Sequence, residues 1–521
     1  MNASYPHLPS PIGGVRPALT RSRRVRDPLL VGLAGAISLS IALAVTVAMP
    51  KPNYLLVFGL VFGALAVVVL SVHSRLEVSV ALLALYLGLL DGPIKLLAYN
   101  QATSAIRDVL IAAIALGALV RVIERGQGVR LPPLSGWVIA FVALVVVQAF
   151  NPNTHGLLKV IGGFRQQLEW VPFFFFGYAL MRSRERFRKL FLILGVIALA
   201  NGLVSTYQTR LSPGQLASWG PGYAELVHGS ETVSARKYVS EGVARVRPPG
   251  LGSDTGFAGG MGVLALAGAL ALLANSWGPR RRWIALLLCL GAMLAVATSL
   301  ARLSAVGAVV GVIAFMLLSL SAGSRVSRSL GALLIVGVFA LPLGAVLVAS
   351  EGSGVFSRYE SIAPSKVVGT STSYKEVSLS QIPHVIATTP FGFGLASAGP
   401  ASAFGGRSGV KLEGHGFSAE TQYNFVTDEL GLPGLVLWVA LSLLVIGLAV
   451  RGLPRVKDVD VRIYLAGMFA AFIAFTIMGF DGPSAAGVAF GSYFWFALGT
   501  AAYWFAGPGR RADENGLVAL S

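Results

Sequence analysis

Apolar runs recur along the whole chain, and most approach the length of about 20 residues that an α-helix needs to cross the hydrocarbon core of a bilayer. Their number predicts an all-α polytopic membrane protein with about 12–14 transmembrane helices. Two runs are short, and the segment Asp91–Pro93 after one of them is compatible with a re-entrant turn. The runs lie near residues 29–49, 54–72, 78–91, 105–120, 134–150, 168–181, 190–206, 255–275, 284–300, 303–321, 330–349, 430–450, 463–480 and 485–505.

Lysine and arginine accumulate in every second connection between these runs, as they do in the cytoplasmic loops of membrane proteins. The alternation is consistent from end to end, so we expect both termini to be cytoplasmic. The first run is long enough to span and follows a basic leader without a convincing cleavage site, which indicates an uncleaved helix. The predicted parts are a basic cytoplasmic N-terminus at 1–28, an integral membrane domain at 29–506 and a cytoplasmic tail at 507–521.

Composition agrees with this class, since 55% of the residues are hydrophobic and only 12% are charged, against about a quarter in soluble proteins. Much of the net charge of +18 belongs to the topogenic arginines, so we expect a lipid bilayer and no nucleic acid as partner. Cys289 is the single cysteine and the six histidines lack ligand spacing. A glycine-rich phosphate loop is also absent, so we expect neither a metal nor a cofactor.

Two exterior connections are long, at about 207–254 and 350–425, and long loops in compact proteins are usually functional or disordered. The first contains Trp219, Tyr223 and Tyr238, which either stack on sugar faces or anchor the loop at the membrane interface. It ends in Arg247, which is followed by two prolines. The planar fork of this guanidinium suits a diphosphate, whereas the alternative is an arginine that snorkels to the interface.

Arg302 lies in a very tight exterior turn between two apolar helices. A cation there either caps a helix C-terminus through the macrodipole or belongs to a binding site. An exterior arginine runs against the positive-inside bias, and ionisable groups near membrane depth are candidate site residues. Both interpretations stay open at this stage.

The second long loop contains a short amphipathic helix that runs into a glycine turn over Pro383–Leu395. Further on, Glu420, Asn424 and Asp428 share one helical face before Gly431–Gly434 breaks the helix. We expect this polar face to look into an exterior cavity. Tyr423 and Asn424 would then either bind sugar hydroxyls or pack the loop helix.

Several patterns in this order resemble the O-antigen ligase and Wzy-type polysaccharide polymerase superfamily of integral membrane glycosyltransferases. The resemblance covers roughly residues 160–450, and the order and common outward face of the motifs are more specific than any one of them. The motifs are Gly163–Arg165 with Glu169, Arg247–Gly250, Thr298 and Ser299 with Arg302, Pro390–Gly394 and Glu429–Leu435.

This resemblance implies a GT-C-like fold and a metal-independent enzyme of O-antigen or exopolysaccharide assembly. It would transfer or polymerise glycan from an undecaprenyl-diphosphate-linked donor onto an acceptor hydroxyl, with inversion, at the outer face of the bacterial cytoplasmic membrane. The acceptor is a glycan, a lipid or a protein. Arg247 and Arg302 would bind the leaving diphosphate.

One position departs from the ligase pattern. Counting back from Gly431, the place of the family's histidine is held by Glu420. Glu420 is therefore the predicted general base, which favours a polymerase or a distant ligase-like transferase. His415 is a spare candidate.

Arg165 and Glu169 stand four residues apart and form either a third phosphate contact or a closed ion pair, of which we favour the pair. The rival class is a lipid-linked oligosaccharide flippase or another transporter. Transporters usually show internal repeats and buried midplane charges, whereas here no clear repeat is found and the charges gather at the outer edge. A glycan-binding scaffold without activity is the third alternative, because the base position is altered.

Overall fold

The computed structural model of the protein is predominantly helical. Every described residue belongs to one compact unit, Val69–Ser521. The structure describes residues 75–99, 101–124, 131–154, 156–229, 237–240, 243–275, 278–321, 331–332, 336, 379–403, 421–480, 482 and 487–509. The predicted spans at 29–49 and 54–72, and most of the one at 330–349, lie outside these residues.

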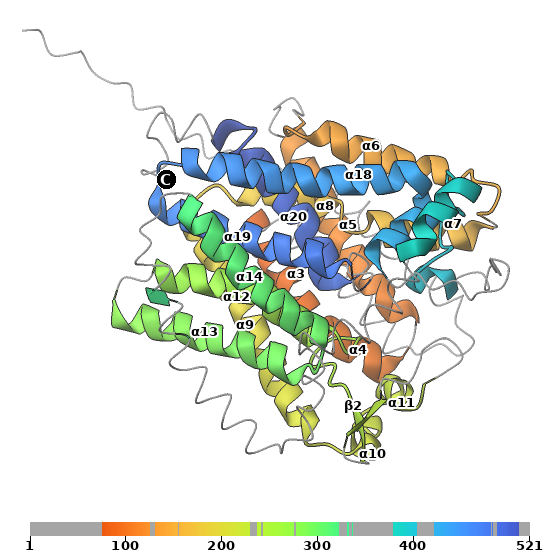
Figure 1. Ribbon diagram of the computed structural model, residues 1–521, viewed down its shortest axis with the longest axis horizontal. Helices are drawn as coiled ribbons and strands as arrows, with labels where there is room; N and C mark the ends of the chain where they lie inside the picture. The colour runs from red at the N-terminus through yellow and green to blue at the C-terminus, as the bar shows by residue number, and fades with distance from the viewer. Residues whose placement is uncertain are drawn as a thin grey trace, which may run out of the picture. The chain divides into compact units, whose positions relative to one another are not determined.

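The order of elements is helical throughout apart from one two-stranded hairpin (Figure 1). The elements are α3 (Leu76–Leu85), the π-helical turn η1 (Tyr86–Leu90), α4 (Asp91–Ala98), α5 (Gln101–Glu124), α6 (Ser135–Gln148), α7 (Leu157–Leu168), α8 (Pro172–Leu180), α9 (Arg184–Thr209), α10 (Pro213–Ala217), α11 (Pro221–His228), β1 (Lys237–Ser240), β2 (Val243–Val246), α12 (Phe257–Ala274), α13 (Pro279–Thr298), α14 (Arg302–Ser321), a helix at 379–388, η3 (Pro400–Ala403), α18 (Gln422–Gly452), η4 (Leu453–Arg455), α19 (Val459–Met478) and α20 (Val488–Trp504).

Within the described residues, seven helices are long and apolar enough to cross a membrane. The protein is thus a multi-pass helical membrane protein, as its apolar runs predict. The number of spans in the whole chain stays a prediction. The seven are Leu76–Ala98, Arg184–Thr209, Phe257–Ala274, Pro279–Thr298, Arg302–Leu320, Gln422–Arg455 and Val459–Met478.

The re-entrant turn suggested at Asp91–Pro93 is wrong, because the chain is helical from Leu76 to Ala98. A π-helical turn at Tyr86–Leu90 accommodates the proline. In π-helical bonding the carbonyl of Gly88 would need the N–H that Pro93 lacks. Asn201 of α9 supplies the donor instead, from Nδ2 to Gly88 O at 3.0 Å.

The most deeply buried helix is α12, which packs against α9, α13, α14 and α19. Its residues are apolar all round, as expected of a helix surrounded by others. Small residues let the backbones approach closely. A Cβ atom at Gly262 would lie 2.6 Å from Ala292 O of α13, and one at Gly467 of α19 would lie 2.8 Å from Ala267 O.

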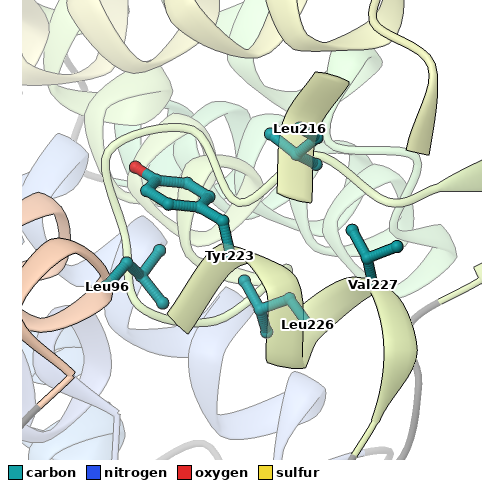
Figure 2. Packing of buried hydrophobic residues seen from close by; sticks show 5 residues of the cluster. All are labelled: Leu96, Leu216, Tyr223, Leu226 and Val227. Atoms are coloured by element: carbon teal, nitrogen blue, oxygen red, sulfur yellow. The ribbon is translucent and has the colours of Figure 1, made fainter. Parts of the chain in front are cut away.

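Residues between α9 and α12, predicted as an exterior loop, form a small cap of two short helices and the hairpin. Ser212 starts α10 with a reciprocal capping box to Gln215. Figure 2 shows Leu96 of α4 gathered with Leu216 of α10 and three side chains of α11, Tyr223, Leu226 and Val227. Trp219 and Val246 pack against this cluster, which fixes the cap on α4. Tyr223 is buried in it, so it packs the cap and presents no face to a sugar.

Candidate functional site

The motif-bearing segments come together at one end of the helix bundle. The start of α12 packs on the α13–α14 turn, since a Cβ atom at Gly259 would lie 2.5 Å from Ser299 Oγ. The start of α18 is joined to the end of α19 by a hydrogen bond from Gln422 N to Gly479 O of 2.8 Å. The end of α19 in turn packs on α14, where Gly307 faces Met478. The segments that carry Arg247, Arg302 and the start of α18 therefore share this end.

Arg247 is half-buried and leads into a firmly held turn, Pro248–Gly252. Gln208 of α9 accepts a hydrogen bond from Gly250 N at 2.8 Å and donates one to Gly250 O at 3.0 Å. Asn201 accepts from Leu251 N at 2.9 Å. This turn also touches α4, because a Cβ atom at Gly92 would overlap the backbone of Leu251 and Gly252. The backbone that presents Arg247 is consequently rigid.

Arg302 is exposed and is the first residue of α14. Among the described residues it has no hydrogen-bond or ion-pair partner. The positive end of the α14 dipole disfavours a cation at this position. Thr298, Ser299 and Leu300 are buried, and Leu300 adopts the left-handed backbone region with φ 53°. A strained turn thus exposes the Arg302 guanidinium at the start of α14, where its charge does not stabilise the helix.

Two of the motifs, Pro390–Gly394 and Glu429–Leu435, meet directly. Leu432 N donates to Pro390 O at 2.8 Å, and Phe393 N donates to Asp428 O at 2.6 Å. Gly431 has φ 67° and kinks α18, which continues to Gly452 beyond it. A Cβ atom at Gly431 would overlap Pro390 O, and one at Gly392 would lie 2.6 Å from Gly431 N. Gly392 and Gly431 are therefore needed both for the close approach of the two backbones and for their left-handed conformation.

Glu429 is fully buried and anchors this contact to α7. It accepts from Gln166 Nε2 at 2.8 Å and from Gln167 Nε2 at 2.6 Å. Ala398 N also points to Oε1, at 3.4 Å. A buried carboxylate needs such donors, because an unpaired one is very costly. Neither glutamine is among the site residues that the sequence predicts.

Lys159 is the buried cation beside this network. Its Nζ donates to Ala396 O at 3.2 Å and to Ser402 O at 3.0 Å. Burial lowers its pKa, and the nearby Glu429 partly opposes that effect. Lys159 therefore fastens both η3 and the segment before it onto α7.

A second polar cluster joins α4, α5 and the end of α7. Arg107 of α5 donates to both carboxylate oxygens of Glu169, with Nη2 to Oε2 at 2.7 Å. Its guanidinium also lies 5.0 Å from the ring centroid of Trp170. Asp91 Oδ2 lies 3.7 Å from Arg107 Nη1 and accepts from Lys95 Nζ at 2.6 Å.

The ion pairs of Arg165 and Glu169 differ from the expected closed pair. Arg165 Nε lies 2.8 Å from Asp108 Oδ2, and Glu169 binds Arg107, so both residues pair with α5. The two partners, Arg107 and Asp108, are adjacent residues of α5. One turn of α7 therefore contacts α5 through its charged residues and α18 through its glutamines.

The predicted polar face of Asn424 and Asp428 does not look into a cavity, because both side chains are buried. Asn424 lies in the first turn of α18, where Thr421 Oγ1 donates to Asn424 Oδ1 at 2.6 Å and accepts from Asn424 N. Tyr423 is also buried, and its hydroxyl donates to Thr476 O at 3.1 Å. Neither carboxylate oxygen of Asp428 has a hydrogen-bond partner in the described part of the chain. Glu420 and His415 lie outside the described residues, as does the side chain of Tyr238.

The cluster of Asp91, Lys95, Arg107 and Glu169 was not predicted from the sequence. The feature that could have indicated it is the presence of charged residues in or beside apolar runs. Asp91 ends one predicted span and Lys95 follows it, and Arg107 and Asp108 lie inside another. Ionisable residues in such runs are functional candidates. Across the residues that the structure describes, no three histidine, cysteine, aspartate or glutamate side chains are grouped as a metal site would require.

No known protein-family model matches the chain, and comparison with curated proteins also finds no match.

Proposed function

We propose that this protein is a GT-C-like membrane glycosyltransferase. It transfers or polymerises glycan from an undecaprenyl-diphosphate-linked donor onto an acceptor hydroxyl at the outer face of the bacterial cytoplasmic membrane. The observation that carries the proposal is the common location of two arginine-bearing segments. The rigid turn after Arg247 leads to the start of α12, which packs on the turn that exposes Arg302. The start of α18 lies at the same end of the bundle.

In the proposed reaction the acceptor oxygen attacks the anomeric carbon of the donor sugar. The bond from that carbon to the diphosphate oxygen breaks, and the diphosphate leaves with the electron pair. Arg247 and Arg302 stabilise its growing negative charge. Glu420, directly before the Thr421 cap of α18, accepts the proton of the attacking hydroxyl. This chemistry uses no nucleotide and no metal.

The remaining candidate residues support this arrangement. Tyr423 and Asn424 hold the start of α18 through their bonds to Thr476 and Thr421. We therefore assign them to positioning the segment that carries Glu420, and not to binding sugar hydroxyls. Arg165 is partly exposed but bound to Asp108, so its role is to join α7 to α5.

A second candidate function is a lipid-linked oligosaccharide flippase. The charges of Asp91, Lys95, Arg107 and Glu169, whose side chains are at most 13% exposed, favour it, because transporters place such groups along their pathways. In this cluster each of the four charges already has an ion-pair partner within 4.0 Å. Such closed ion pairs are typical of a fixed structural network, whereas a transport pathway needs charges that exchange partners.

The test is a mass-spectrometric assay of the purified protein with an undecaprenyl-diphosphate-linked oligosaccharide and candidate acceptors, comparing wild type with Glu420→Gln. We expect a transferred or lengthened glycan and free undecaprenyl diphosphate, both lost in the variant. Glu185→Gln, an exposed carboxylate of α9, is the matched control. Movement of the intact lipid between leaflets of a vesicle, without any glycan product, would reject the transferase and support the flippase.

A further inference from the structure

The strand β2 has two different faces. Side chains alternate between the faces of a strand, and Val246 packs against the apolar cluster of α10 and α11. Arg245 is therefore on the face that points away from that cluster. The register confirms that Arg245 is an inner position of the hairpin, opposite Tyr238, while Val246 is opposite Lys237.

Arg247 belongs to the same face as Arg245. It precedes Pro248, and a residue before proline is held in the extended region. The strand geometry thus continues past its last hydrogen-bonded residue. Two residues of extended chain rise about 7 Å, so the two arginines begin side by side at that spacing.

Arg245 carries a donor that lacks an acceptor. Its Nε is buried, and no described residue accepts a hydrogen bond from it. A buried donor without a partner costs free energy, more so when the group is charged. Placing a second guanidinium two residues away adds like-charge repulsion. An anion between the two side chains removes both costs.

The backbone below the pair is rigid enough to form a site. Pro248 and Pro249 are buried, and the next residues are bound by Gln208 and Asn201 of α9. Neither arginine needs a change of backbone to meet a ligand. Preorganised side chains of this kind bind with less loss of conformational entropy.

We infer that Arg245 and Arg247 together form a binding site for a phosphate-bearing anion, in which Arg245 supplies a second guanidinium beside that of Arg247. Guanidinium forks bind phosphate oxygens in bidentate geometry. Naming the ligand as the diphosphate of a lipid-linked glycan rests on the proposed function. The anion site itself rests on the strand geometry and the unpaired donor.

The first test measures binding of inorganic pyrophosphate to the full-length protein in nanodiscs of neutral phosphatidylcholine, by isothermal titration calorimetry. We expect Arg245→Ala to raise the dissociation constant about tenfold or more, as loss of a charge-assisted hydrogen bond predicts. Arg245→Lys keeps the charge but lacks the planar guanidinium fork, so its dissociation constant should lie between those of wild type and Arg245→Ala. Arg210→Ala, an exposed arginine at the end of α9, is the control and should bind like wild type.

Thermal unfolding of each variant separates loss of the site from loss of the fold. Equal pyrophosphate affinity in wild type and in a folded Arg245→Ala variant would overturn the inference, and so would the absence of binding by wild type. A second arm adds phosphatidylglycerol or undecaprenyl diphosphate to the nanodiscs. Competition with pyrophosphate by phosphatidylglycerol identifies a lipid headgroup as the natural anion, and competition by undecaprenyl diphosphate alone identifies the donor.

The outcome also distinguishes this inference from the proposed function. Pyrophosphate binding that depends on Arg245, in a protein without glycan turnover, keeps the site and rejects the transferase. Turnover that is unchanged in Arg245→Ala, without any pyrophosphate binding, keeps the transferase and rejects the site.

Discussion

Gln167 of α7 donates a hydrogen bond of 2.6 Å from Nε2 to the buried Oε2 of Glu429 in α18. The two residues are 262 positions apart in the chain. The bond fixes α7 to α18, which is kinked at Gly431. Beside this kink α18 is hydrogen-bonded to the Pro390–Gly394 segment. The same turn of α7 binds Arg107 through Glu169. Two buried polar networks of the protein therefore depend on one helical turn.

Replacing Glu429 by alanine should destabilise the protein strongly. The change leaves the buried Gln167 amide without its acceptor, and an orphaned buried donor costs about 1–3 kcal/mol. It also removes one of the two acceptors of Gln166 Nε2, which keeps Ala398 O. Thermal unfolding in detergent measures the effect. Glu185→Ala, an exposed carboxylate on α9, is the control and should unfold near the wild-type temperature. Equal unfolding temperatures for the two variants would show that Glu429 does not hold α18 to α7.

Arg107 and Glu169 should show strong coupling in a double-mutant cycle. Removal of one partner leaves a buried charge unpaired, which costs about 3–5 kcal/mol. We expect Arg107→Met and Glu169→Met each to lower the unfolding temperature, and the double variant to be more stable than either single one. Strictly additive losses would contradict a closed ion pair. The exposed pair Lys189 with Glu185 serves as a reference cycle with little coupling.

Gly431→Ala should impair folding or activity, because Gly431 combines φ 67° with contact to Pro390 O. The left-handed backbone alone costs a residue with a Cβ about 1–2 kcal/mol, and the overlap adds to it. Gly447→Ala is the matched control, since that glycine lies in the same helix with open space at its Cβ position. Protein yield and thermal unfolding report the difference. An equally stable Gly431→Ala variant would show that the 390–394 segment can move away.

Arg302→Ala should abolish glycan transfer without loss of stability. The side chain is exposed and begins α14, where the helix dipole disfavours its charge. Its removal is therefore expected to leave the unfolding temperature unchanged or slightly higher. Arg282→Ala, an exposed arginine near the opposite end of α13, is the control. Normal turnover by a stable Arg302→Ala protein would remove Arg302 from the site.

Several local features followed from the sequence because their causes are local. Apolar runs of bilayer length predict spanning helices, and seven of these lie in the described residues. Gly431 and Pro433 predicted a break, and the structure kinks at Gly431. The helix at 379–388 and the glycine turn after it also agree with their pattern.

Side-chain partners were decided only by the tertiary structure. Arg165 and Glu169 looked like a local pair, yet both contact α5, about sixty residues earlier. Asn424 and Asp428 looked like a face toward water, yet both side chains are buried. Helical spacing states which residues share a face, whereas packing decides what that face meets. The free energy of a charge depends on that neighbour, so the sequence by itself determined the spanning helices and the kink, and the fold alone determined the charge network.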